Sequence, residues 1–361
     1  MFLVNLRRAK SAHLSTCVKN DLVGLNARRL SYSAIALAWL LGASTLTGHV
    51  RASHPASIQA PATAQTQSGA RGQRAIGNTI ADHPSSVYRF ERHTLDSADG
   101  KRRYRIEIAI PKMANMLPRA GVPAPAITAA APAAGFPVLY MLDGNSAMAT
   151  LKDDDLAMLA RTRPTVLVAI GYDVDTRNDV VSRAYDYTPP AYDNGKPAPP
   201  PVVRGREGGG ADVFLALIQS RIAPLVQARA KVNPKQSYLW GHSYGGLFTL
   251  HTLFTQPDAF ARYIVGDPSA WWNDGALVQE WQAFKAERAA GKRIGIFVGT
   301  KPRDAPRPTA ALTDQRAAIA DMAEGLRAGG ANVSYEAFPQ YGHGEMIRAS
   351  LERALQIVTE P

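Results

Sequence analysis

Apolar residues occur in runs along this chain from residue 138 onward, and stretches with helical spacing fill the intervals between the runs. A run in which nearly every position is apolar suits a strand that is buried on both faces of a parallel sheet. Residues 104–110 alternate between apolar and polar side chains instead, which predicts a half-exposed strand ending at Pro111. The apolar runs predict six further strands at 138–142, 165–170, 238–240, 262–265, 294–298 and 333–338.

Between these runs, apolar residues recur three and four positions apart, which is the spacing of one helix face. Residues 313–328 and 345–358 show this period, and so do residues 212–230. Strands that alternate with helices predict an α/β fold with a mostly parallel central sheet flanked by helices. In 212–230 the apolar positions that show this spacing include Val213, Leu217, Ile218, Ile222 and Leu225.

Two segments depart from this alternation. Residues 113–135 are rich in Ala and Pro, which predicts a surface insertion. Residues 187–211 contain six prolines and three consecutive glycines at 208–210. This second segment is too long for a plain connection, so it is either a lid-like insertion over a functional site or a mobile insert.

The first 52 residues have the features of an export signal. Arg28 and Arg29 precede an apolar run at 32–46, whose length is typical of a signal peptide and short for a membrane span. Cleavage before Ser53 would leave no stable membrane span and would place the protein in the periplasm. The alternative is an uncleaved N-terminal membrane anchor. Residues 53–84 predict a flexible Ala/Pro-rich linker, and the folded domain is expected at 85–361.

Composition and charge narrow the class of partner. The chain has 361 residues, 46% hydrophobic and 20% charged, which is ordinary globular composition. The net charge of +11 falls to +5 without residues 1–52, which hold seven bases and one acid. No basic helix interleaved with aromatic residues follows, so a nucleic-acid partner is excluded, whereas a small anionic ligand suits the balance. The single cysteine, Cys17, excludes a disulfide scaffold and a cysteine metal site.

The most specific motif is GHSYGG at 241–246, which contains the pattern G-x-S-x-G. An apolar strand precedes it and an apolar helix follows, as in the nucleophile elbow of the α/β-hydrolase fold. The sequence therefore predicts an α/β-hydrolase with Ser243 as the nucleophile. The alternative is a Gly-rich turn with an idle serine.

A nucleophilic serine needs a base, which this fold supplies after its last strand. His343 lies in the loop between the predicted strand 333–338 and the last helix, so it is the expected base. His242, beside the nucleophile, is expected to point elsewhere and to be structural. The oxyanion hole is expected to consist of the backbone N–H groups of Tyr244 and Asn145.

The acid of the triad is left open by the sequence. It usually follows the strand before the histidine, here 294–298, and Asp304 lies a few residues beyond that position. Asp267, after the strand at 262–265, is a second candidate. A Ser–His dyad without any acid is the third alternative.

Several segments together resemble the periplasmic siderophore esterases, the salmochelin/enterobactin trilactone hydrolases of the esterase-D-like α/β-hydrolase superfamily. The resemblance covers about residues 85–361 and implies a serine esterase that opens a cyclic triester of N-acylated serines. It also implies a Ser–His dyad in some members, with both roles falling on Ser243 and His343. The segments are LYMLDGN at 139–145, RAYDYTP at 183–189, GHSYGG at 241–246, PSAWW at 268–272 and YGHGE at 341–345.

A ferric catecholate siderophore is an anion with planar rings, so arginines and aromatic residues would suit it. The alternative is that the tryptophans belong to the core and the arginines only make the surface soluble. The expected substrate-binding residues are Arg183, Tyr185, Arg204, Arg206, Trp271 and Trp272.

The leading hypothesis is thus an exported siderophore esterase that needs no cofactor and no metal. A general carboxylesterase or acyltransferase acting on feruloyl, acetyl or mycolyl-type esters is one alternative. A non-catalytic siderophore-binding protein on a hydrolase scaffold is the other.

Overall fold

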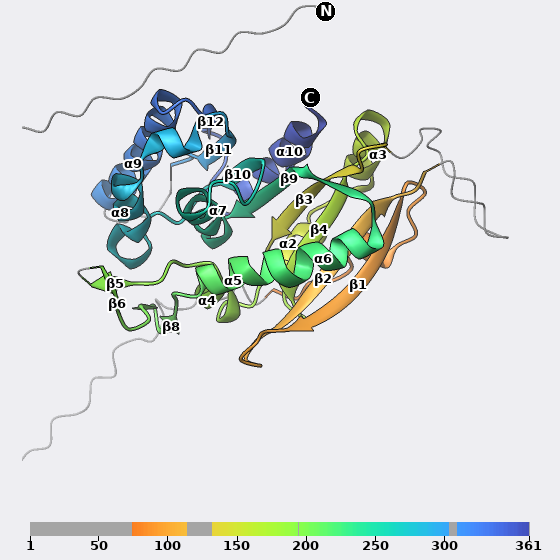
Figure 1. Cartoon of the computed structure of the whole chain (residues 1–361), viewed down its shortest axis with the longest axis horizontal. Coiled ribbons are helices and arrows are strands. Elements are labelled where there is room, and N and C mark those ends of the chain that lie inside the picture. The colour runs from red at the N-terminus through yellow and green to blue at the C-terminus, as the bar shows by residue number, and fades with distance from the viewer. Residues whose placement is uncertain (1–73, 114–131, 194, 303–308, 361) are drawn as a thin grey trace, which may run out of the picture. The chain divides into compact units, whose positions relative to one another are not determined.

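A mixed sheet of eight strands forms the centre of the folded chain (Figure 1). The computed structural model describes residues 74–113, 132–193, 195–302 and 309–360. The strands lie in the order β1-β2-β4-β3-β9-β10-β11-β12. Their bounds are Tyr88–Asp96 (β1), Arg103–Pro111 (β2), Phe136–Leu142 (β3), Val166–Tyr172 (β4), Val232–His242 (β9), Arg262–Gly266 (β10), Arg293–Gly299 (β11) and Asn332–Phe338 (β12).

The sheet is parallel from β4 to β12, and β1 and β2 add an antiparallel edge. The six apolar runs of the sequence coincide with the six parallel strands, and the alternating segment 104–110 lies in β2. The predicted α/β fold with a mostly parallel sheet is therefore confirmed. Strand β1 has no counterpart among the predicted strands, because an edge strand with mostly half-buried residues carries no apolar run.

The predicted helices are also present. Residues 313–328 lie in α9, and 345–358 correspond to α10 with its N-cap Glu345. The predicted helix 212–230 corresponds to α5, a π-helical turn (Ile218–Ile222) and α6. Pro224 stands in the first turn of α6 and has no N–H to donate, and the wider π turn precedes it. The helices are α2 (Gly144–Met148), α3 (Asp153–Thr162), α4 (Ser182–Asp186), α5 (Ala211–Leu217), α6 (Ala223–Arg229), α7 (Tyr244–Thr255), α8 (Ala276–Ala283), α9 (Thr309–Ala328) and α10 (Met346–Thr359).

Helices cover both faces of the sheet, and successive side chains of β9 show which helix lies on which face. Trp240 points toward α10, since its Nε1 donates to Ser350 Oγ at 3.2 Å. Gly241, the next residue, faces α7, because a Cβ there would lie 2.3 Å from the carbonyl oxygen of Gly245. The end of β9 thus lies between the helix that follows the elbow and the last helix of the chain.

The insertion at 187–211 forms two small antiparallel hairpins. Its strands are only two residues long: β5 (Tyr192–Asp193) pairs with β6 (Lys196–Pro197), and β7 (Val202–Val203) pairs with β8 (Arg206–Glu207). The insertion is attached at its end, where Gly209 N–H donates to Thr188 Oγ1 at 3.0 Å and Gly210 N–H to the carbonyl of Tyr185 at 2.9 Å. Most of the other predicted insertion, 113–135, lies outside the described residues.

The N-terminal predictions fall mainly on residues that the structure does not describe, including the whole signal segment 1–52. The described part of the chain begins at residue 74, before the predicted boundary at residue 85. Ile76 N–H donates to the carbonyl of Asp175 at 3.0 Å, and Thr79 and Asp82 cap a 3-10 helix at Ile80–Asp82. Of the helices in the described part of the chain, none has the length and apolarity that a membrane span requires.

Candidate active site

Ser243 stands at the sharp turn between β9 and α7. Its backbone has φ 61° and ψ −116°, a strained conformation for a residue with a side chain. The turn requires Gly241, since a Cβ there would lie 2.4 Å from the carbonyl carbon of Gly245. The strain and the close approach together expose the serine at the carboxyl edge of the sheet, which is the geometry of a nucleophile elbow.

Three side chains form a hydrogen-bonded chain that ends at this serine. Ser243 Oγ lies 3.1 Å from His343 Nε2, and His343 Nδ1 lies 2.5 Å from Asp267 Oδ2. His343 reaches the site from the loop between β12 and α10, and Asp267 follows β10 directly. The side chain of His343 is 39% exposed, so a substrate can reach the imidazole from solvent.

Asp267 is the carboxylate that the structure places against His343. Burial alone would raise the pKa of Asp267, but the hydrogen bond and positive charge of His343 and the hydrogen bond from Gly299 N–H hold this pKa below its usual range. The carboxylate therefore stays ionised beside the imidazole. Asp304, the first of the two candidate acids in the sequence, lies outside the described residues.

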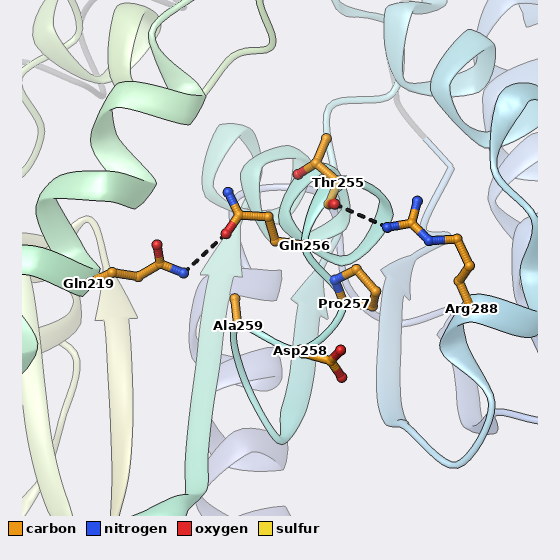
Figure 2. A pocket seen from close by; sticks show the side chains of 7 residues that line it. All are labelled: Gln219, Thr255, Gln256, Pro257, Asp258, Ala259 and Arg288. Atoms are coloured by element: carbon orange, nitrogen blue, oxygen red, sulfur yellow. Dashed lines mark hydrogen bonds between the residues drawn. The ribbon is translucent and has the colours of Figure 1, made fainter.

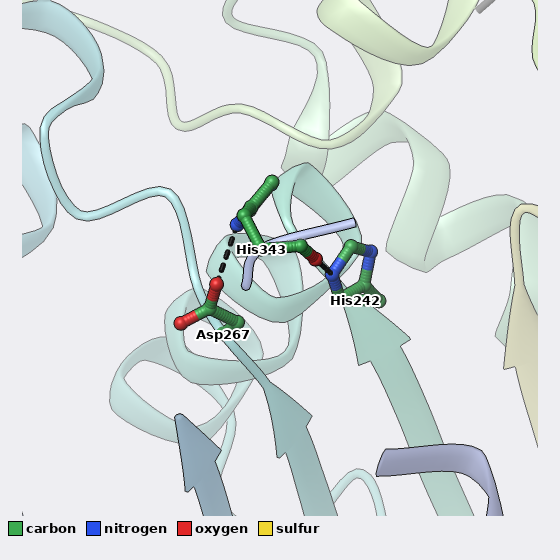
Figure 3. A group of neighbouring side chains, drawn as sticks. All are labelled: His242, Asp267 and His343. Atoms are coloured by element: carbon green, nitrogen blue, oxygen red, sulfur yellow. Dashed lines mark hydrogen bonds and ion pairs between the residues drawn. The ribbon is translucent and has the colours of Figure 1, made fainter. Parts of the chain in front are cut away.

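His242 supports the loop that carries His343 (Figure 3). Its Nε2 donates to the carbonyl oxygen of His343 at 2.8 Å, and the two rings lie 4.9 Å apart. Burial, helped by the nearby charge of His343, lowers the pKa of His242 to about 3, so this ring is neutral at working pH. A neutral ring can keep its N–H donor, which agrees with the structural role expected for it.

His242, Asp267 and His343 also offer three atoms within 4.8 Å of one another that could hold a metal ion (Figure 3). Each side chain already makes a hydrogen bond inside the network. The second nitrogen of His343 faces Ser243. This arrangement suits the movement of a proton from the serine to the imidazole.

Two backbone N–H groups are candidates for the oxyanion hole. Tyr244 is the first residue of α7 and Asn145 is the second residue of α2, so neither N–H has an acceptor within its own helix. The two turns are close, since a Cβ on Gly245 would lie 3.8 Å from Asp143 Oδ2. The Asn145 side chain fixes the α2 turn by donating to the carbonyl of Thr176 at 2.9 Å.

Arg183 is held by Asp143 in this same region. Its Nε and a terminal nitrogen lie 2.8 and 2.7 Å from the two carboxylate oxygens, and both side chains are largely buried. Asp143 has the left-handed φ of 49° and caps α2, and its N–H donates to Tyr187 Oη at 3.0 Å. The sequence hypothesis gives Arg183 to an anionic substrate, whereas this pairing ties its charge to the loop that precedes Asn145.

Arg204 and Trp271 lie on the exposed side of the elbow. Arg204 occupies the turn of the β7–β8 hairpin, and its guanidinium carbon lies 4.1 Å from the Trp271 ring centre. The centres of the Trp271 and Tyr244 rings lie 6.0 Å apart. The guanidinium of Arg183 lies 5.1 Å from the centre of the Tyr244 ring. Two arginines thus flank a pair of aromatic rings beside the nucleophile.

The other predicted binding residues lie in different surroundings. Burial raises the pKa of the Tyr244 phenol, and the positive charges of Arg183, Arg204 and Arg206 act against this rise. Arg206 is the first residue of β8 in the insertion. Tyr185 packs under the guanidinium of Arg102 at 4.2 Å. Trp272 is 2% exposed and belongs to the core.

A separate pocket of about 550 Å³ lies at the far end of α7 (Figure 2). Thr255 is the last residue of this 12-residue helix, so the pocket lies about 18 Å from the elbow. Arg288 donates to the carbonyls of Phe254 and Thr255 there, each at 3.3 Å. The Arg288 side chain thus caps the helix, and the pocket contains no residue of the Ser–His–Asp chain.

Sequence reasoning missed two residues of this site. Ser269 Oγ lies 3.2 Å from Ser243 Oγ, and Asp143 binds Arg183. Ser269 belongs to the PSAWW segment and Asp143 to the LDGN turn, so both lie inside motifs that the sequence analysis quotes. Their partners are 26 and 40 residues away in the chain, and no local pattern indicates such pairs.

Comparisons with known proteins give a consistent result. Residues 123–344 match the Esterase family, described as "Putative esterase". The apo-salmochelin esterase of Escherichia coli O6:H1 is 35% identical over 282 residues, which cover 78% of this chain and 83% of that protein. The ferri-bacillibactin esterase of Bacillus subtilis is 29% identical over 64% of this chain and 81% of its own length. A solved enterobactin and salmochelin hydrolase is 33% identical, with 78% of this chain and 99% of that one covered at a TM-score of 0.63.

Proposed function

The chain belongs to the Esterase family and is a carboxylic ester hydrolase, and from this premise we propose that it opens ester bonds of a catecholate siderophore with Ser243, His343 and Asp267 as its catalytic triad. The observation that carries the proposal is the hydrogen-bonded chain from Asp267 through His343 to Ser243 at a strained elbow. The similar siderophore esterases support the substrate class.

The first half-reaction forms an acyl-enzyme. His343 Nε2 accepts the proton of Ser243 while Oγ attacks the ester carbonyl carbon. The N–H groups of Tyr244 and Asn145 stabilise the negative charge that develops on the carbonyl oxygen. The bond to the alcohol then breaks, and His343 returns the proton to the departing alkoxide.

The second half-reaction releases the acid. Water gives a proton to His343, and the resulting hydroxide adds to the acyl carbon. The bond to Ser243 Oγ breaks, and Oγ takes the proton back from His343. Asp267 holds His343 in the tautomer with its proton on Nδ1 and stabilises the imidazolium that forms in both halves.

The substrate part of the proposal rests on charge and ring contacts. The carbonyl under attack belongs to a serine ester whose acylated amine carries a catechol ring. Trp271 offers a half-exposed aromatic face beside the nucleophile, and Arg204 adds a cation at 4.1 Å from that ring. A planar anionic ring is the chemistry that such a pair recognises, and a ferric catecholate has both the ring and the charge.

Export to the periplasm is part of the same proposal. The support is the apolar run at 32–46 behind Arg28 and Arg29, followed by the Ala/Pro-rich stretch at 53–84. N-terminal sequencing of the protein from a periplasmic fraction is expected to begin near Ser53. A chain that still starts upstream of residue 32 in that fraction would favour the uncleaved anchor.

The central experiment is a chromatographic assay of ferric and iron-free enterobactin with the wild-type chain and Ser243→Ala. The wild type is expected to yield linear and shorter products, and a fluorophosphonate probe is expected to label it. Ser243→Ala should lose both properties by at least about ten-thousandfold. Labelling without product from either siderophore would favour the general carboxylesterase, and no labelling would favour a binding protein.

A further inference from the structure

Ser269 lies against the nucleophile and takes no part in the triad mechanism. Its Oγ is 3.2 Å from Ser243 Oγ, and its backbone N–H donates to the Ser243 carbonyl at 3.1 Å. Only 1% of the residue is exposed, and Ser243 Oγ is the one hydrogen-bond partner of this hydroxyl among the described residues. Buried hydroxyl groups in proteins form hydrogen bonds, and this one forms its hydrogen bond to the reacting oxygen of Ser243.

The direction of this hydrogen bond follows from the triad. The Asp267 carboxylate can only accept, so the neutral imidazole of His343, the form that acts as the base, carries its proton on Nδ1 and leaves Nε2 as an acceptor. Ser243 therefore donates its single proton to Nε2. Between the two serines the donor must then be Ser269, and the acceptor is a lone pair of Ser243 Oγ.

We propose that Ser269 is a further catalytic residue, which donates a hydrogen bond to Ser243 Oγ in both halves of the reaction. The proposal rests on the proposed role of Ser243 as nucleophile. An sp³ hydroxyl oxygen has one proton and two lone pairs. With the proton on His343 and one lone pair on Ser269, the second lone pair alone is free to attack the ester carbonyl.

The charge on Ser243 Oγ explains the catalytic gain. In acylation Oγ becomes partly negative as its proton moves to His343 and before its bond to carbon is complete. In deacylation Oγ becomes partly negative again as the acyl bond breaks and before His343 returns the proton. Ser269 stabilises both stages by the same hydrogen bond and keeps its own proton throughout, so the balance of the reaction does not change.

The test compares Ser269→Ala with the wild type on a 4-nitrophenyl ester and on a fluorophosphonate. Hydrogen bonds to charged groups contribute about 1.5–3 kcal/mol, so kcat and the rate of phosphonylation are expected to fall by about 10- to 100-fold. KM is expected to change little, because Ser269 acts on Oγ and not on the remote part of the substrate. A pH profile should keep its shape while its plateau falls.

Ser350→Ala is the matched control. Ser350 is also fully buried and accepts a hydrogen bond from Trp240 Nε1, but it lies in α10, on the face of the sheet opposite α7. The Ser350→Ala variant should lose about as much thermal stability as Ser269→Ala and keep its kcat unchanged. If Ser269→Ala keeps kcat and the phosphonylation rate within twofold of the wild type, the proposal is wrong. Activity that survives in Ser243→Ala would overturn the proposed nucleophile itself, a different result.

Discussion

Two aspartates follow parallel strands at the carboxyl edge of the sheet and bind different basic side chains. Asp143 follows β3 and Asp267 follows β10, and both have a left-handed backbone, with φ 49° and φ 41°. Aspartate tolerates this conformation better than most residues. Asp143 binds the guanidinium of Arg183 through both oxygens, whereas Asp267 binds the imidazole of His343 through one.

The guanidinium of Arg183 and the imidazole of His343 suit the two pairs to different tasks. A guanidinium is charged at every working pH, so the pair of Asp143 and Arg183 is a permanent lock on the loop before Asn145. An imidazole nitrogen can accept a proton and release it again, so the pair of Asp267 and His343 can take part in proton transfer. The pair of Asp143 and Arg183 thus fixes the position of the loop before Asn145, whereas the pair of Asp267 and His343 takes part in proton transfer.

The largest effect in this comparison is expected from Asp267→Asn. An amide can present its NH₂ group to His343 and select the wrong tautomer, so the imidazole would no longer accept the proton of Ser243. We expect kcat to fall by about ten-thousandfold, with KM for a 4-nitrophenyl ester nearly unchanged. Steady-state kinetics on purified protein measure both quantities.

A fall of less than about tenfold in kcat would contradict this expectation. It would show that Ser243 and His343 act as a dyad, which is the alternative that the family resemblance implies for some members. Asp304→Asn serves as the comparison variant, since Asp304 is the other acid that the sequence suggests.

A smaller effect is expected when the pair of Asp143 and Arg183 is broken. Arg183→Met would leave Asp143 buried without its cation, and the loop before Asn145 would relax. A displacement of about 1 Å at an oxyanion donor can cost about a hundredfold in rate. We expect kcat to fall by about that factor on both enterobactin and 4-nitrophenyl acetate.

Equal loss on a charged and a neutral substrate is what distinguishes this role from substrate binding. A rise in KM for the ferric siderophore alone would return Arg183 to the role that the sequence hypothesis gave it. Arg92→Met is the control, because Arg92 in β1 makes two hydrogen bonds, at 2.9 and 2.6 Å, to the buried carboxylate of Glu107 in β2, at the antiparallel edge of the sheet. It should lower stability without a fall in kcat.

The sequence predicts the sheet and the elbow because their signals are local. Apolar runs indicate the parallel strands, and the spacing of Gly241, Ser243 and Gly245 indicates the turn. The histidine follows from its place after the last strand. These features require no knowledge of which distant segments meet.

The partners of the two aspartates could not be chosen in this way. Asp267 and His343 are 76 residues apart, and the choice between Asp267 and Asp304 depends on which strand end turns toward the imidazole. Arg183 looks available for a substrate in the sequence, because nothing near it in the chain shows that Asp143 neutralises it. Such pairings depend on tertiary structure, which a local pattern does not encode.

A third buried charged group, His251, is expected to affect the stability of the fold and not the reaction. His251 in α7 lies between Glu280 and Asp212, with ring nitrogens 2.8 and 3.1 Å from their carboxylates. Burial alone would lower the pKa of His251, but these two carboxylates raise it to about 9. This imidazole therefore behaves like the guanidinium of Arg183, as a fixed charge that connects α7 to α5 and α8.

The sign of the pH effect follows from this raised pKa. The stabilisation is complete below the unfolded-state pKa of about 6.5 and is lost as the pH rises toward about 9. Denaturant unfolding at pH 6 to 10 is expected to show this alkaline loss. In His251→Gln the loss should disappear, with the unfolding constant at pH 6 larger by a factor on the order of a hundred. Glu280→Gln should flatten the same limb, and an unaltered alkaline slope in both variants would contradict the assignment.

The smallest effect is expected from a substitution of Arg204. This substitution tests whether the exposed residues beside the elbow bind the charged part of the substrate. Arg204 lies in an exposed hairpin turn with its guanidinium over Trp271. Arg204→Ala should raise KM for ferric enterobactin by about three- to fivefold and leave 4-nitrophenyl acetate unchanged, because an exposed charge contributes at most about 1 kcal/mol. Added salt should reproduce the change, since exposed charges are screened over about 10 Å at 0.1 M. Lys196→Ala removes the same charge from the neighbouring hairpin and is the control. If both variants raise KM equally, only the net charge of the insertion matters, and the pair of Arg204 and Trp271 has no part in selecting the acyl group.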